Sequence, residues 1–106
     1  MKPSLGRTVY LICHDIIVVD PVYMVGKDHF LIGKVGETGH CQTWNCEYDE
    51  YNKTWFTSFR KAKKAIMNST VAKHYIRPVL VKRFNGYYAL KEKTYGEKAK
   101  WTTVNT

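Results

Sequence analysis

Hydrophobic and polar residues alternate over most of the first half of the chain, and this period of two predicts β-strands. The predicted strands lie at residues 9–13, 16–19, 22–25, 29–35 and 40–48. Asp20-Pro21 is expected to break the second run, because proline has no N–H to donate to a strand ladder. Gly26-Lys27-Asp28 and the segment 36–39 supply turns. We therefore expect a three- or four-stranded antiparallel meander.

A period of three to four residues replaces this alternation after residue 58 and predicts one amphipathic helix. Thr57 and Ser58 are good N-cap residues, so the helix is expected to begin near Ser58 and to run about three turns. Its apolar face carries Phe59, Ala62, Ala65, Ile66 and Ser69. Its opposite face carries Arg60, Lys61 and Lys64, with Lys63 at the border. Trp55 and Phe56 are expected to form either a short strand or a tight entry to the helix, with rings that cover its start.

A β-hairpin is predicted after the helix, because Asn85-Gly86 favours the positive φ angles of a type I′ turn. Residues 71–76 fit either a frayed helix end or a linker, which Arg77-Pro78 ends. The expected cross-strand pairs are Phe84–Tyr87, Arg83–Tyr88, Lys82–Ala89 and Val81–Leu90. The expected core face is Val79, Val81, Tyr88 and Leu90, and the other face is Lys82, Phe84, Tyr87 and Lys91. Residues 98–104 are a candidate edge strand.

The order of these elements defines the expected fold class. The 106 residues are 44% hydrophobic and 14% aromatic, which is typical of one folded domain over residues 1–106. Strands, one helix and then a hairpin predict an α+β fold: an antiparallel β-meander, one central helix laid across the sheet, and a C-terminal β-hairpin.

The charge of the chain is strongly asymmetric. Its formal net charge is +8. Residues 1–50 carry four basic and seven acidic side chains, a net −3, whereas residues 51–106 carry thirteen basic and two acidic side chains, a net +11. If the two halves form distinct faces, the molecule has an acidic flank and a basic flank. Nucleic acid, an acidic protein surface and anionic lipid are the partners that a basic flank fits.

The cysteine count and the N-terminus indicate the compartment. Cys13, Cys41 and Cys46 make an odd number, which fits a reducing cytosol better than a disulfide framework. The first apolar run is stopped by His14 and Asp15 and does not look like a secretory signal. The hydrophobic stretch 9–25 is too short and too polar to cross a bilayer. We therefore expect a cytoplasmic protein with no membrane partner.

The residues that could carry catalysis or a metal are poorly placed. His40-Cys41 and Cys46 lack the ligand spacing typical of zinc, and on a strand the two cysteines point to opposite faces. Cys13 and His14 are adjacent, so their side chains diverge on a strand and do not make an activated thiolate. We predict no metal, no cofactor and no enzymatic activity. A small enzyme that uses Cys13 or Cys46 is a distant alternative.

The basic second half is the remaining candidate site, since it interleaves cations with aromatic rings. Lysine and arginine contact phosphates, and exposed rings stack on bases. The alternative is that the rings are core and the cations a solvated rim. A helix prefers acids in its first turn, yet this one carries Arg60 and Lys61. The predicted binding residues for a polyanion are Arg60, Lys61, Lys63, Lys64, Lys82, Arg83, Tyr87 and Lys91.

The segment Tyr48–Ser58, YDEYNKTWFTS, is followed by KAKKAI at 61–66. It resembles small proteins encoded by bacteriophages and mobile elements of Gram-positive bacteria, in which a β-meander runs into a "WFTS" or "VFTS" helix entry. That set includes anti-CRISPR and other anti-defence inhibitors. Arg60 and Lys61 replace the acidic residues that usually follow. Many anti-CRISPR proteins are acidic nucleic-acid mimics, so the resemblance implies that a +8 chain would instead grip guide RNA, DNA or an acidic protein surface.

Two functional hypotheses follow. The leading one is a small non-enzymatic phage-type interaction protein, an anti-CRISPR-like inhibitor of a host defence nuclease that acts through the basic helix and hairpin in the host cytoplasm. The alternative is a DNA- or RNA-binding accessory protein whose binding is sequence-independent and strongly salt-dependent. The expected partner is a host defence protein, a nucleoprotein complex or nucleic acid, and the sequence indicates no oligomeric state.

Overall fold

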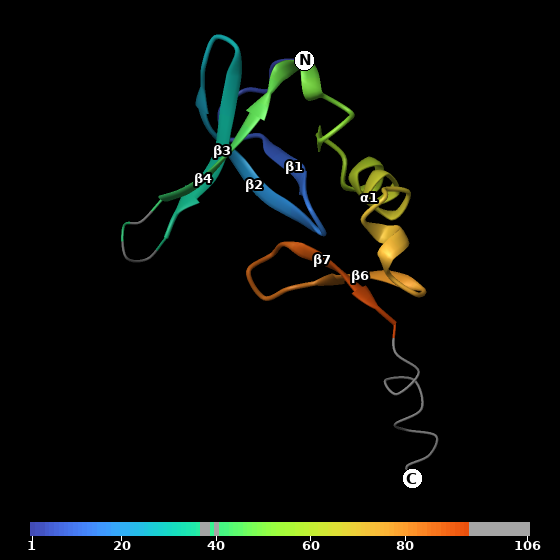
Figure 1. The fold of residues 1–106 in the computed structure, drawn as a ribbon. Helices are drawn as coiled ribbons and strands as arrows, with labels where there is room; N and C mark the ends of the chain where they lie inside the picture. Colours follow the sequence, from blue (N-terminus) through green and yellow to red (C-terminus); the bar gives the residue numbers. More distant parts are fainter. Residues whose placement is uncertain (37–38, 40, 94–106) are drawn as a thin grey trace.

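The computed structural model describes residues 1–36, 39 and 41–93. The protein folds as a curled antiparallel sheet with one helix packed on it (Figure 1). The helix α1 spans Phe59–Met67, and two short 3-10 helices, η1 and η2, cover Tyr48–Glu50 and Ala72–His74. The prediction of an α+β fold with an antiparallel meander and one helix is confirmed. The candidate strand at 98–104 lies outside the described residues. The strands are β1 (Thr8–Cys13), β2 (Ile16–Val25), β3 (His29–Val35), β4 (Cys41–Glu47), β5 (Trp55–Phe56), β6 (Pro78–Lys82) and β7 (Tyr88–Glu92).

Strand β2 runs without a break through Asp20-Pro21, so the predicted interruption is wrong. The Val22 N–H donates to the Arg7 carbonyl at 2.8 Å, and the Val22 carbonyl accepts from the Gly6 N–H at 2.9 Å. Backbone groups alternate between the two edges of a strand, so the Pro21 nitrogen points to the opposite edge. Registered pairing with β3 begins only at Val22, and the missing N–H therefore costs no ladder hydrogen bond.

The two edges of β2 determine where a cavity can form. The sheet order is β4-β3-β2-β1-β5, and the β6–β7 hairpin joins through β7. Along the described part of β2, strand β7 pairs with the first two residues, Ile16 and Ile17, and strand β3 pairs with β2 from Val22 onward. Residues 18–21 of β2 therefore face a gap between β3 and β7. Figure 1 shows the hairpin below the turn end of β1 and β2, away from the loop that joins β2 to β3.

Opposite faces of the β1–β2 pair carry separate hydrophobic clusters. The first cluster contains Val9, Leu11, Val18, Val22, Phe30, Ile32, Cys46 and Trp55. The second lies under the helix and contains Ile17, Phe56, Ala62, Ile66, Ala72 and Leu90. Trp55 and Phe56 are neighbours on β5 and point to opposite faces, so this two-residue strand contributes to both clusters. The short strand is confirmed, but only Phe56 lies in the cluster under the helix.

The helix is formed as its sequence predicts. Ser58 is the N-cap, and its hydroxyl accepts from the Lys61 N–H at 3.4 Å. Ala62 and Ile66, one turn apart, are fully buried against the sheet. Helix α1 packs on β1, β5, β2 and β6. The ambiguous segment 71–76 contains the 3-10 turn η2, which Tyr75 ties to the β1–β2 turn by donating to Asp15 at 2.9 Å.

The hairpin has a different turn and register from the predicted ones. The Gly86 N–H donates to the Arg83 carbonyl at 2.9 Å, and the Arg83 N–H donates to the Tyr87 carbonyl at 2.7 Å. Residues 84–86 therefore form a three-residue loop with Gly86 at φ 91°, in place of a type I′ turn. The observed pairs are Pro78–Glu92, Val79–Lys91, Leu80–Leu90, Val81–Ala89 and Lys82–Tyr88.

This one-residue shift changes which side chains share a face. Leu80, opposite Leu90, packs in the cluster under the helix, where Val79 and Val81 were expected. Lys82 lies opposite Tyr88, and Tyr87 packs against the first cluster. The predicted shared face of Lys82, Phe84, Tyr87 and Lys91 is therefore wrong.

Candidate functional site

The predicted cations of the helix are all exposed. Arg60, Lys61, Lys63 and Lys64 lie on the side of α1 that faces away from the sheet. Within the described part of the chain, none of these four side chains forms an ion pair. Lys61 and Lys64 line a shallow hollow of about 380 Å³ together with Asn52, Phe56, Ala65 and Asn68. The helix thus presents positive charge that no described carboxylate neutralises.

The predicted residues of the hairpin lie around its tip and along β7. Lys82, Arg83 and Lys91 are exposed, whereas Tyr87 is half-buried. Phe84, at the tip, is fully exposed. Arg83, Phe84 and Tyr87 line a second hollow of about 410 Å³, which also contains Asn85 and Tyr88. This hollow shares no lining residue with the hollow beside α1, so the predicted residues form two groups.

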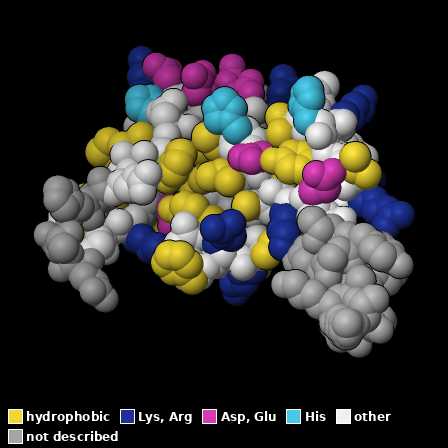
Figure 2. Space-filling view, turned by 60° about the horizontal axis from the view of Figure 1, so that its bottom comes forward, with side chains coloured by type: hydrophobic (Ala, Val, Ile, Leu, Met, Phe, Trp, Pro, Cys, Tyr) yellow, Lys and Arg dark blue, Asp and Glu magenta, His cyan; other side chains and the backbone are white. Residues whose placement is uncertain are grey.

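The charge asymmetry of the sequence is partly reproduced in space. His29 pairs with Glu47 at the end of β3 and β4, and η1 adds Asp49 and Glu50 beside them. That end of the sheet lies opposite the β6–β7 hairpin. Figure 2 shows several Asp and Glu side chains along the upper rim of the molecule, and others lower on the same face among exposed apolar side chains. Three acidic residues lie close to the hairpin: Asp20 in the gap along β2, Asp15 in the lining of the hollow at the hairpin tip, and Glu92 at the end of β7.

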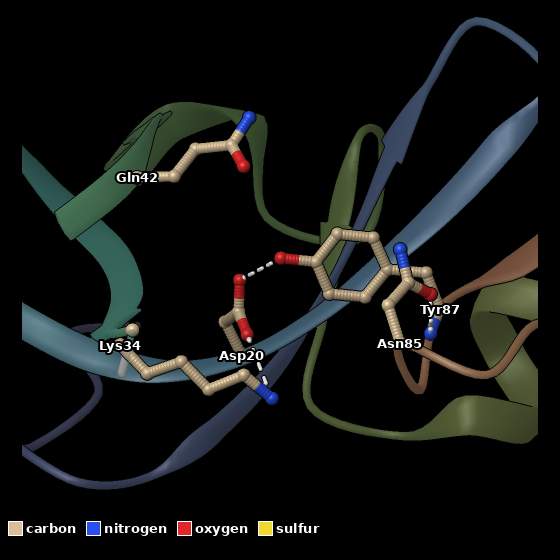
Figure 3. Close-up of a pocket in the computed structure, with 6 residues that line it drawn as sticks. Asp20, Lys34, Gln42, Asn85 and Tyr87 are labelled. Atoms are coloured by element: carbon tan, nitrogen blue, oxygen red, sulfur yellow. Dashed lines mark hydrogen bonds and ion pairs between the residues drawn. The ribbon is translucent and has the colours of Figure 1, made fainter. Parts of the chain in front are cut away.

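A cavity of about 320 Å³ occupies the gap along β2. Three strands and the hairpin line it: Asp20 comes from β2, Lys34 from β3, Gln42 from β4, and Asn85 and Tyr87 from the hairpin, and Gly36 completes the lining. Figure 3 shows Tyr87 and Lys34 reaching the Asp20 carboxylate, with Gln42 across the cavity and Asn85 beside Tyr87. The cavity shares Asn85 and Tyr87 with the hollow at the hairpin tip.

The Asp20 carboxylate is buried but only partly satisfied. Its side chain is 1% exposed, and Oδ2 accepts a hydrogen bond from the Tyr87 hydroxyl. Oδ1 lies 3.7 Å from Lys34 Nζ, and it accepts no hydrogen bond from any described residue. Lys34 is 61% exposed, so much of its charge remains in water. A buried polar atom without a partner is costly, which makes Oδ1 the atom most in need of a donor.

Tyr87 contacts both the Asp20 carboxylate and the first hydrophobic cluster. Its ring makes an edge-on pair with Trp44 at a centroid distance of 6.5 Å. The Trp44 Nε1 is buried and donates to no described acceptor. Burial and then the hydrogen bond to Asp20 raise the pKa of Tyr87 to about 12, so the phenol remains a donor at neutral pH.

The Tyr87 hydrogen bond is expected to fail at high pH. The pKa of Tyr87 in the folded state, about 12, is above the ordinary value of 10.0. The stability that the protonated phenol contributes is therefore complete below pH 10 and is lost as the pH rises through about 12. Urea unfolding from about pH 9 to about pH 12 should show a steeper loss of stability for the wild type than for Tyr87→Phe. Tyr51→Phe, which removes another phenol, is the control and should keep the steep loss. Equal slopes for the wild type and Tyr87→Phe would contradict this assignment.

Sequence reasoning found Tyr87 but missed Asp20, Lys34, Gln42 and Asn85 as site residues. One pattern could have indicated Asp20. It falls in the alternating series Ile16, Val18, Asp20 and Val22, whose apolar members all pack in or against the first cluster. A carboxylate at a core-facing strand position requires partners. Those partners come from other strands and from the hairpin loop, which the series does not reveal.

Among the cysteine and histidine candidates, Cys46 lies in the first cluster and Cys13 packs against it, whereas His40 lies outside the described residues. His14 is exposed in the β1–β2 turn with φ 57°, beside the half-buried Cys13. Burial raises the pKa of the Cys46 thiol to about 12, which is unfavourable for a nucleophile. Over the described ranges, no group of three or more His, Cys, Asp and Glu side chains is close enough to hold a metal ion.

Comparisons with known proteins give no relative. No family model matches the chain, and no significant match was found among curated proteins or solved structures. The resemblance to phage proteins therefore stays a prediction. In the described part of the chain, no helix has the length and apolar character needed to cross a bilayer.

Proposed function

We propose that this protein is a small non-enzymatic interaction protein that binds single-stranded nucleic acid through the tip of the β6–β7 hairpin and the cations of α1. The bound nucleic acid is either free or part of a host defence nucleoprotein. In the second case the protein would act as the anti-CRISPR-like inhibitor that the resemblance implies. The proposal concerns backbone and base contacts, so it requires no cofactor and no metal.

The observation that carries the proposal is the hairpin tip. Phe84 is fully exposed and lies between the exposed residues Arg83 and Asn85. An aromatic ring is costly to leave in water and has no packing role there. Exposed rings beside cations are the platforms on which unpaired bases stack while the cations bind phosphate. The half-buried rings of Tyr87 and Tyr88 line the hollow next to it.

The helix supplies the second part of the surface. Four exposed cations without described ion-pair partners repel one another, and a polyanion would relieve that repulsion. Arg60 and Lys61 also lie in the first turn of α1, where positive charge opposes the helix dipole. Helix and hairpin tip form separate groups, so the proposed ligand is extended and contacts both.

Replacing Phe84 with alanine is expected to weaken binding of a short single-stranded oligonucleotide by about tenfold, the lower part of the range measured for one stacked base. Fluorescence anisotropy with labelled oligouridine and oligodeoxythymidine measures this. Affinity for both strands should fall steeply between about 50 mM and about 200 mM salt, because phosphate contacts release counterions.

The matched control is Ile76→Ala, which removes another exposed apolar side chain at the far end of β6. It should bind like the wild type. Equal binding by Phe84→Ala would reject the hairpin tip as a stacking platform. Binding to a defence nucleoprotein but to no free strand would shift the partner to an acidic protein surface, and loss of all salt dependence would reject a polyanion as ligand.

A further inference from the structure

We infer that the Asp20 cavity is a base-binding pocket that selects an unpaired guanine, and this inference rests on the proposed binding of single-stranded nucleic acid. The pocket offers a buried carboxylate oxygen that lacks a hydrogen-bond donor, with an ammonium group 3.7 Å away. It opens between the strands and the hairpin, and its lining includes polar side chains from β2, β3, β4 and the hairpin loop (Figure 3).

The arrangement of donors and acceptors is what selects the base. Along its Watson–Crick edge guanine presents the O6 acceptor and then the N1–H and N2–H donors. Lys34 Nζ can donate to O6 while Asp20 accepts from the neighbouring N–H groups. Adenine would place its N1 lone pair against the carboxylate, and cytosine would place N3 and O2 there. Uracil offers one N–H between two acceptors. Guanine therefore matches the Lys34 ammonium and the Asp20 carboxylate best.

Lys34 is the group that admits the base. Its side chain is 61% exposed and its ammonium lies too far from Oδ1 for a hydrogen bond. The ammonium can therefore turn from the carboxylate to O6 at little cost, while Tyr87 keeps Oδ2 fixed. The base then supplies the donor that Oδ1 lacks. Gln42 carries an amide group that can donate to, or accept from, the remaining edges of the ring. The Asn85 Oδ1 already accepts from the Tyr87 N–H at 2.9 Å, so Asn85 offers its Nδ2 as a donor.

The size and position of the pocket agree with this ligand. A volume of about 320 Å³ falls in the range of small-molecule sites, which begins at about 300 Å³. Asn85 lines both this pocket and the hollow that contains Arg83 and Phe84. An oligonucleotide can therefore place one phosphate on Arg83, stack one base on Phe84 and put the adjacent base beside Asp20. Reading unpaired bases on their Watson–Crick edge is the usual route to sequence preference in single strands.

The test compares a short oligouridine with versions in which one central base is guanine, inosine or adenine. Fluorescence anisotropy should show that one guanine tightens binding by about tenfold, within the discrimination of a bidentate base contact. Inosine lacks the N2 amino group and should give an intermediate gain, and adenine should give none. Because the ligand is varied and the protein is unchanged, misfolding cannot produce this order.

Protein variants then assign the preference to the pocket. Asp20→Asn and Lys34→Met should each abolish the gain from guanine. Lys34 is largely exposed, so its variant is expected to fold even if the buried Asp20→Asn does not. Lys27→Met, an exposed lysine in the β2–β3 turn, should retain the preference. Retention of the guanine preference in Lys34→Met or in folded Asp20→Asn would overturn the assignment to this pocket.

The outcomes separate this inference from the proposed function. Salt-sensitive binding of all four oligonucleotides with equal affinity would overturn the guanine pocket and leave the proposed function standing. Failure of every oligonucleotide to bind would overturn both. A gain with adenine equal to the gain with guanine would also overturn it, because stacking alone and not the Asp20 carboxylate would then explain the gain.

Discussion

Truncation of Trp55 to alanine is expected to lower the free energy of unfolding by about 3–5 kcal/mol, the usual cost for a buried large aromatic residue. Trp55 is fully buried, packs against Phe30 with a centroid distance of 4.8 Å, and lies 4.7 Å from the ring of Tyr51. Its Nε1 donates to the Glu47 carbonyl at 2.6 Å, so the variant also leaves an acceptor without its donor. Since small domains are stable by about 5–15 kcal/mol, the variant should lose a large share of its stability.

Urea denaturation followed by circular dichroism measures this effect. Trp55→Phe keeps a ring but loses the hydrogen bond and should fall between the wild type and alanine. Phe84→Ala is the matched control, because it removes an aromatic side chain from full exposure and should change stability by less than about 0.5 kcal/mol. A small loss for Trp55→Ala, similar to that control, would mean that β5 does not join the two clusters as described.

Reversal of two helix charges, Arg60→Glu with Lys64→Glu, is expected to give the largest loss of nucleic-acid binding. The two side chains lie one turn apart on the exposed face of α1 and have no ion-pair partner in the described chain. Each lost phosphate contact should reduce the salt dependence by about one in the slope of log affinity against log salt. Arg60→Glu places an acid in the first turn of α1, where the helix dipole favours it, whereas Lys64→Glu places one in the last turn, where the dipole disfavours it. The two effects on the helix should therefore largely offset each other.

The control is a variant with the same change in net charge at another place. Arg7→Glu with Lys27→Glu puts two reversed charges near the end of β2 that is remote from the hairpin. If the basic helix is the binding surface, only the α1 variant should lose the steep salt dependence. Equal losses would show that overall charge attracts the ligand, and unchanged binding by the α1 variant would reject the helix as part of the site.

The sequence alone determined the parts of this fold that depend on local periodicity and chain breaks. The alternation of apolar residues placed β3 at His29–Val35 correctly, and Ser58 with the spacing of Ala62 and Ile66 placed α1. These features follow from interactions within one element, namely capping, side-chain direction and burial of one face. The exposure of the helix cations also followed from the same periodicity.

Only the tertiary structure decided the hairpin register and the Asp20 cavity. Asn85-Gly86 favoured a two-residue turn, but in the observed register, with its three-residue loop, the half-buried Leu80 lies opposite the buried Leu90 and packs against the same cluster under the helix. The contacts of the hairpin with this cluster therefore outweighed the local turn preference. Asp20 gains its partners from β3 and from the hairpin, far apart in the sequence. Which distant segments lie side by side depends on the strand order and curl of the whole sheet. A local sequence pattern carries no information about that arrangement.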